Sequence, residues 1–243
     1  MKFSKGTTVV LNSLSSINPS ILFPAGENVL RVMDPPKSMF ARATIQEKID
    51  DGMAIYDVPQ FLSTLNMFGE YELTPAKDFA TIQFPNKSSM RYIFASPAVV
   101  NAPEKDMQFP NHHIEFELSK EILEAILKVS ASTGLQDVCI TPAAPEGISL
   151  KVTNYEAGST NESNNEWSIY IPATIDEDLG EFMILFYVSS FAKMIKRNYT
   201  VKLSAKKIGS FEATNPETDV DDEYEITYVI AFAHESQIVD PEE

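Results

Sequence analysis

The chain has 243 residues, 44% of them hydrophobic, and carries a formal net charge of −16 from 35 acidic and 19 basic residues. A chain of this length and apolar content can bury a core without metals or disulfides, and its one cysteine, Cys139, excludes an intramolecular disulfide. The acidic excess argues against generic binding of nucleic acid, because non-specific affinity for DNA comes chiefly from cations that neutralise phosphates.

The sequence contains no candidate membrane span and no secretory signal. Its opening residues, Met1–Lys5, lack an apolar stretch, and no run approaches the ~18 apolar residues that a membrane span requires. Cys139 lies between Val138 and Ile140, which is typical of a small core residue rather than a reactive thiol. We therefore expect a soluble cytoplasmic protein with no membrane partner.

Two short amphipathic helices are predicted in the first half of the chain. The first follows Ser4, which can cap it, and Lys5 lies on its outward face. Its apolar stripe at helical spacing consists of Val10, Leu11, Leu14 and Ile17. The second helix follows Asp57, with Pro59 in its first turn, and its outward face is polar but uncharged.

Two more helices are predicted in the second half. The third begins at Ser119 and has Lys120 and Lys128 on its outward face, together with two glutamates. The fourth follows Ser189 and Ser190. Its inward residues are predicted to be Phe191, Met194 and Ile195, and its outward ones Lys193, Lys196 and Arg197. Three of the four predicted helices therefore turn basic residues toward solvent.

The rest of the chain reads mainly as strands, because β-branched and aromatic runs alternate with turn residues. Strands are predicted near residues 20–24, 28–33, 39–45, 52–57, 70–74, 79–84, 90–95, 113–118, 136–141, 147–153, 166–172, 181–187, 199–204, 208–213 and 223–233. Since strands far outnumber helices, we expect the α+β class, with two helices covering one face of an antiparallel sheet in each half.

One passage occurs twice. Residues 54–74 recur as residues 184–204 at a constant offset of 130: the apolar positions agree, as in Val58 and Val188, whereas the polar ones differ. This pattern is typical of two segments that share buried core positions but have different surface residues. We therefore predict two similar domains in tandem, 1–110 and 111–243, with a proline-containing connector at about 96–112.

The basic residues are concentrated in one window. From Phe182 to Phe211 the sequence has no Asp or Glu but six of the 19 basic residues, while acids gather at 217–225 and 240–243. Each run alone could be an ordinary solvated loop. The position of the bases on outward helix faces favours a basic surface on an otherwise acidic protein.

No pattern of an active site is present. The nine glycines are spread singly, so they form neither a dinucleotide fingerprint nor a phosphate loop. The histidines, His112, His113 and His234, do not have metal-ligand spacing, and there is no Gly-x-Ser-x-Gly elbow. We expect a protein that is not an enzyme and that has no cofactor or metal.

Several short passages resemble one family. They are the opening Met-Lys-x-Ser-Lys-x-Thr-Thr, then Ala54–Asp57, the connector passage Val99–Pro103, and Leu127–Ser130. In order and spacing they are similar to the DNA polymerase sliding clamps of large tailed phages. The chain departs from that pattern in a longer loop at 154–166 and in extra acids near its C-terminus.

The resemblance implies a homotrimeric ring in the host cytoplasm, in which six clamp-fold domains place twelve helices around duplex DNA. Helices ~9–10 Å apart would leave a hole of about 25–30 Å. It also implies a DNA polymerase tethered by its C-terminal peptide, a clamp-loader ATPase, and a second role in late transcription. On this resemblance the DNA-facing residues would be Lys5, Lys120, Lys128, Lys193, Lys196 and Arg197.

The resemblance further implies an apolar pocket for partner peptides near the connector. The candidate residues are Val99, Val100, Pro103, Phe232 and Ile238. The same residues could instead close the junction of the two domains. A rival hypothesis for the whole chain is a trimeric structural or accessory protein of a virion, which would lack a basic side facing DNA.

Overall fold

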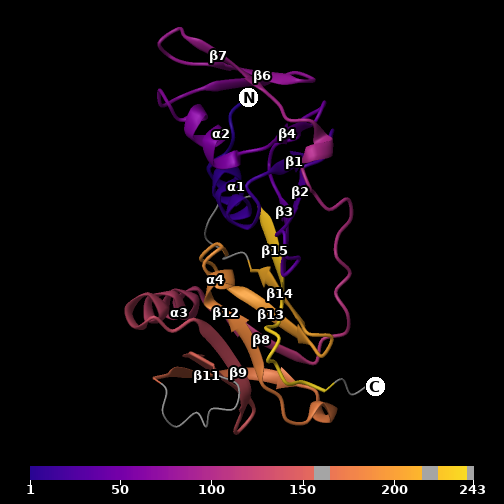
Figure 1. Cartoon of the computed structure of the whole chain (residues 1–243), viewed down its shortest axis with the longest axis vertical. Coiled ribbons are helices and arrows are strands. Elements are labelled where there is room, and N and C mark those ends of the chain that lie inside the picture. The colour runs from indigo at the N-terminus through magenta and orange to yellow at the C-terminus, as the bar shows by residue number, and fades with distance from the viewer. Residues whose placement is uncertain (156–164, 215–223, 240–243) are drawn as a thin grey trace. The chain divides into compact units, whose positions relative to one another are not determined.

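The structure is a computed structural model that describes residues 1–155, 165–214 and 224–239 (Figure 1). The described residues form two compact units. Unit 1 holds residues 1–107 and 224–227, and unit 2 holds residues 108–155, 165–214 and 228–239. Each unit has its own helices, its own sheet strands and its own buried core.

Unit 1 combines two helices with antiparallel strands. Its elements are α1 (Lys5–Ile17), β1 (Ile21–Phe23), β2 (Val29–Met33), β3 (Met39–Thr44), β4 (Met53–Ile55), α2 (Val58–Leu65), β5 (Glu72–Pro75), β6 (Phe79–Gln83), β7 (Ser89–Ile93) and the 3₁₀ turn η1 (Pro97–Val99). Strand β1 pairs with β4, β2 with β3, and β6 lies between β5 and β7. Helix α1 packs against α2 and against β2 and β3.

Both helices of unit 1 begin where the sequence predicts. The Ser4 hydroxyl accepts a hydrogen bond of 3.0 Å from the Thr7 N–H, and Asp57 accepts one of 2.9 Å from the Gln60 N–H. Such caps satisfy backbone donors that the first turn of a helix leaves unpaired. The whole predicted stripe of α1 is buried, namely Val10, Leu11, Leu14 and Ile17.

Unit 2 is built around a larger antiparallel sheet. Its elements are β8 (Ile114–Leu118), α3 (Lys120–Thr133), β9 (Asp137–Ala143), β10 (Gly147–Thr153), β11 (Trp167–Ile175), η3 (Glu177–Leu179), β12 (Ile184–Tyr187), α4 (Val188–Phe191), β13 (Tyr199–Ser204), β14 (Ile208–Ala213) and β15 (Glu225–Ala231). The strand order is β12-β9-β10-β11-β8-β13-β14. The boundary between the two units falls within β15. Helices α3 and α4 pack on each other (Figure 1).

An aromatic cluster forms the centre of unit 2. Phe186 of β12 is fully buried and meets Phe191 of α4, Phe211 of β14 and Phe232 edge-on, with ring centroids 5.8, 5.7 and 5.1 Å apart. Edge-to-face geometry of this kind adds to the stabilisation from buried area. The cluster therefore fixes α4 on one face of the sheet, and that face is the buried one.

A C-terminal segment lies along strand β12, which is the last strand in the sheet order of unit 2. The backbones of Met183 and Gln237 exchange two hydrogen bonds of 2.7 Å, and the Ala233 N–H donates to the Leu185 carbonyl at 2.7 Å. The Leu185 N–H donates to the Ser236 hydroxyl at 2.9 Å. This segment pairs backbone groups at the edge of the sheet.

The predicted α+β class and antiparallel pairing are confirmed, but the fourth helix differs from its prediction. Helix α4 ends at Phe191, and the next residues form turns in which Met194 N–H bonds to the Phe191 carbonyl. The Ile195 N–H donates to the Tyr228 hydroxyl at 3.1 Å, and the Ile195 carbonyl accepts from Tyr199. Two tyrosines thus take the backbone groups that a longer helix would pair internally.

Candidate functional site

Four of the six predicted DNA-facing residues are exposed on or beside the helices. Lys5 is the first residue of α1, and Lys120 is the first residue of α3, where its N–H donates to the Asn198 side chain at 2.8 Å. Lys128 follows two turns later in α3, and Lys196 lies in the turns after α4. Their ammonium groups are therefore available to a phosphate backbone.

The remaining two predicted residues are less accessible. Lys193 is half-buried, and Arg197 is only 7% exposed. The prediction that Arg197 lies on an exposed helix face is wrong, because α4 ends at Phe191 and the chain then turns inward. Both residues interact with other groups of the chain. The guanidinium of Arg197 is therefore largely shielded from solvent.

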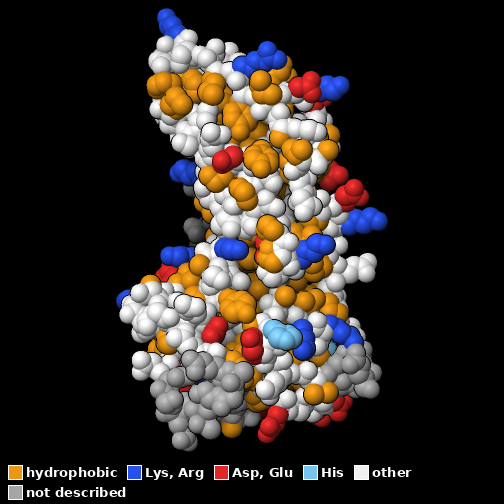
Figure 2. All heavy atoms as spheres, in the orientation of Figure 1, with side chains coloured by type: hydrophobic (Ala, Val, Ile, Leu, Met, Phe, Trp, Pro, Cys, Tyr) orange, Lys and Arg blue, Asp and Glu red, His pale blue; other side chains and the backbone are white. Residues whose placement is uncertain are grey.

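The exposed face of α3 carries acids as well as bases. Glu121 and Glu124 are exposed on the same helix as Lys120 and Lys128. Hydrogen bonds from its own backbone and from the Ser119 hydroxyl hold the pKa of Glu121 below its usual value. The helix face is thus nearly neutral overall, and Figure 2 likewise shows Lys and Arg side chains as separate spots rather than one basic block on the face in view.

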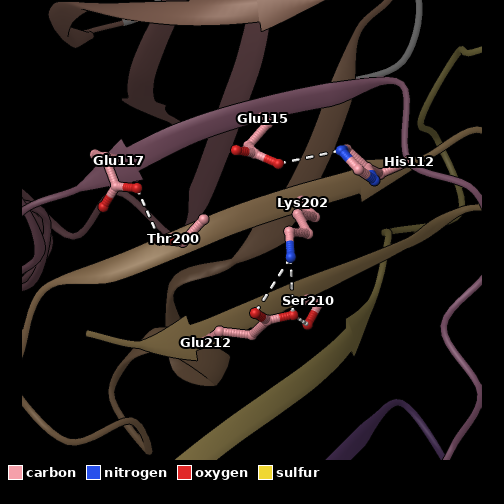
Figure 3. Close-up of polar contacts among 7 residues, drawn as sticks. All are labelled: His112, Glu115, Glu117, Thr200, Lys202, Ser210 and Glu212. Carbon is pink, nitrogen blue, oxygen red and sulfur yellow. Dashed lines mark hydrogen bonds and ion pairs between the residues drawn. The ribbon is translucent and has the colours of Figure 1, made fainter. Parts of the chain in front are cut away.

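The opposite face of the sheet in unit 2 is polar and mainly acidic (Figure 3). Glu115 contacts His112 at 3.1 Å, and Glu117 accepts a hydrogen bond of 2.7 Å from Thr200. Lys202, opposite Glu115 in the β8–β13 register, contacts Glu212 at 3.3 Å. Alternation along β13 sends the neighbouring residues of this strand to the buried side, where α4 packs. The acidic face and the helices are therefore on opposite sides of this sheet.

The candidate peptide-pocket residues fall into two groups. In unit 1, Val99 ends η1 and is 58% exposed, Val100 is 6% exposed, and Pro103 is half-buried. In unit 2, Phe232 belongs to the aromatic cluster, and Ile238 is half-buried beyond it. Burial of Phe232 against Phe186 gives it a clear role in the core, so exposed Val99 is the stronger candidate for contact with a partner.

Unit 1 also has an open cleft of about 540 Å³ beside the start of the connector. It is lined by residues 22–25, 51–54, 77–78 and 94–97. No local pattern in the sequence predicts this cleft. One signal was Gly52, which has a φ of +71° and whose added Cβ would lie 3.0 Å from the Phe23 carbonyl oxygen. Only glycine adopts such a conformation readily.

No group of three or more His, Cys, Asp or Glu in residues 1–155, 165–214 and 224–239 could hold a metal ion. Within the same ranges, no helix is long and apolar enough to cross a membrane. Cys139 is buried against Leu185 and Ala233.

Cys139 is expected to be unreactive in the native protein. Burial raises the pKa of its thiol to about 11, so only about one molecule in a thousand would carry the thiolate at pH 8. We expect a disulfide reagent to label the native chain at least ~100-fold more slowly than the chain unfolded in urea. Equal labelling rates in the two states would contradict the burial of this residue.

The sequence is similar to known phage proteins. A family model described as "DNA polymerase processivity factor" matches residues 2–95. The "Sliding clamp" of Vibrio phage KVP40 is 28% identical over 221 residues, which are 87% of this chain and 94% of that protein. The "Sliding clamp" of Enterobacteria phage T4 is 30% identical over 143 residues, which are 58% of this chain and 62% of that protein.

Three solved structures of clamp proteins show a similar fold. Proliferating Cellular Nuclear Antigen from Entamoeba histolytica superposes with a TM-score of 0.67 at 12% identity, over 96% of each chain. PCNA from Thermococcus kodakaraensis superposes with a TM-score of 0.65 at 12% identity, over 95% of this chain and 98% of that one. The H. pylori beta clamp superposes with a TM-score of 0.63 at 11% identity, over 95% of this chain and 64% of that one. The resemblance and the clamp fold expected from the sequence are both confirmed.

Proposed function

We propose that the chain, which is similar to phage proteins named sliding clamp and matches a DNA polymerase processivity factor model over residues 2–95, is itself a sliding clamp that encircles duplex DNA as a homotrimer and tethers the replicative polymerase. We also propose that residues 1–110 and 111–243 are its two clamp domains, so that a closed ring would contain six.

The observation that carries this proposal is a difference in charge between the two sides of the unit 2 sheet, because the helix side is nearly neutral and the opposite side is mainly acidic. Exposed Lys120, Lys128 and Lys196 lie on or beside its helices, while Glu115 and Glu117 lie on the opposite face. With the helices turned toward DNA, these lysines would face phosphates and the mainly acidic face of the sheet would point to solvent. Attraction of this kind is long-range and independent of base sequence.

A nearly neutral helix face suits sliding. Strong phosphate contacts would hold the ring at one place, whereas a few lysines interspersed with glutamates give only weak attraction at any position. A closed ring stays on DNA without such contacts, because it can leave only by opening or by reaching an end. A tethered polymerase then remains near its template through a high effective concentration. The clamp itself makes and breaks no covalent bond in this mechanism.

Further partners follow from the same proposal. A ring that must open to admit DNA needs a loader, and we propose an ATPase in that role. We propose that the C-terminal peptide of the polymerase docks near Val99, Val100 and Pro103, and that the protein works in the host cytoplasm. We also propose a role in late transcription, which is supported by the resemblance to phage sliding clamps alone.

The test is retention on DNA of different topology. Loaded onto a nicked circular plasmid, the protein is expected to co-elute with the DNA in gel filtration and to be lost once a restriction enzyme linearises the circle. Blocking both ends with bulky protein caps should restore retention. Equal retention on circles and on open linear DNA would overturn encirclement, and native mass measurement should show a trimer.

A further inference from the structure

Two arginines stand directly opposite each other on unit 1. Arg31 of β2 and Arg42 of β3 are paired residues in the antiparallel register, and like charges in such positions destabilise a strand pair. Their side chains are only 16% and 31% exposed. Partial burial weakens screening by solvent and salt. An anion close to both guanidinium groups would relieve this repulsion.

The connector supplies that anion. Asp106 accepts a hydrogen bond of 2.7 Å from Arg31 Nε through one carboxylate oxygen, and its second oxygen lies 3.3 Å from Arg42 Nε. Glu27 contributes a longer contact of 3.8 Å to Arg31. The hydrogen bond from Arg31 holds the pKa of Asp106 below its usual value. Charge networks of this kind contribute more than isolated surface pairs do.

The contact occurs at an informative place in the connector. The Val99 and Val100 N–H groups donate to the Ser96 and Pro97 carbonyls at 3.0 and 3.2 Å, and the Val100 side chain is buried. Residues 101–105 follow without helix or strand, and Asp106 comes next. This stretch is thus held at one end by apolar burial and at the other by the two arginines. Fixing both ends of a short segment reduces its conformational freedom.

We propose that Asp106 is a positioning residue, which bridges Arg31 and Arg42 and so holds connector residues 101–105 in the conformation on which partner peptides dock. The proposal rests on the proposed function, because it assumes that peptides dock at the connector. Preorganisation of this kind raises affinity by lowering the entropy that binding must otherwise remove. The latch formed by these three residues lies wholly within unit 1.

The experiment compares Asp106→Asn with a matched control, Glu27→Gln. Both substitutions remove one carboxylate near Arg31, but only the first changes the connector. In the full-length protein, D106N is expected to speed amide hydrogen exchange of residues 101–107 by about fivefold to tenfold. It should raise the Kd of a labelled C-terminal peptide of the cognate polymerase about threefold to tenfold. E27Q should leave both close to wild type.

A second variant tests the bridge itself. Arg42→Gln is expected to change hydrogen exchange and peptide Kd less than D106N does. Combined with D106N it should cause no further change, because the two residues act through one contact. If D106N matches wild type both in the hydrogen exchange of residues 101–107 and in the Kd of the peptide, the latch is overturned. Faster exchange with unchanged affinity would overturn the positioning role alone. Failure of the wild-type protein to bind the peptide would instead count against the proposed docking, whatever the exchange data show.

Discussion

Replacing the four exposed helix lysines, Lys5, Lys120, Lys128 and Lys196, with glutamate is expected to slow loading onto primed circular DNA by on the order of tenfold or more. These side chains are exposed and lie at or beside helices α1, α3 and α4. Attraction between lysines and phosphates accelerates encounter, and its loss should also flatten the dependence of the loading rate on salt. Loader-dependent appearance of the protein on a primed circle measures both quantities.

The same variant separates electrostatic from topological retention. A ring that has closed is held by its topology, so its residence time on an uncut circle should change far less than its loading rate. The matched control reverses the exposed loop lysines Lys37, Lys48, Lys77 and Lys87, which alters the net charge by the same amount. If both variants load equally slowly, net charge alone explains the effect and the helix lysines have no special role.

Truncating the central aromatic ring of unit 2 is expected to have the largest effect on stability. Phe186 is fully buried and contacts three other phenylalanines, so Phe186→Ala should lower the free energy of unfolding by about 3 to 5 kcal/mol. That loss is a large part of the ~5–15 kcal/mol that typically stabilises a domain. The midpoint of urea unfolding, followed by circular dichroism, measures it.

Tyr187 provides the control for this substitution, because it is the next residue of the same strand but is 52% exposed. Alternation along a strand turns it to the other face, and Tyr187→Ala should shift stability by only about 0.5 kcal/mol. A comparable loss in both variants would mean that strand propensity matters here, and that the aromatic cluster does not dominate the core.

Most elements of the fold could be predicted from the sequence, because each depends on local signals. Ser4 and Asp57 cap the helices that they precede, and every predicted strand overlaps an observed one. The fourth helix could not be predicted correctly. Phe191, Met194 and Ile195 have helical spacing, but the backbone groups of Ile195 bond to the hydroxyls of Tyr199, four residues on, and of Tyr228, 33 residues on. Arg197 was misplaced for the same reason.

The connector latch shows a second limit of sequence analysis. Arg31 and Asp106 are 75 residues apart, and Arg42 meets them only because β2 and β3 pair in one particular register. A shift of one residue would send Arg42 to the other face of the sheet. The cleft beside the connector likewise combines four separate segments. Such sites depend on tertiary pairing, which local patterns do not specify.

The segment that lies along β12 has a consequence for how copies of this protein behave at high concentration. An uncovered outer strand offers unpaired N–H and C=O groups to any other chain, which favours runaway association into insoluble material. Hydrogen bonds from Ala233 and Gln237 occupy part of this edge. By covering part of this edge, residues 233–237 leave fewer backbone groups with which a second copy of the chain could pair.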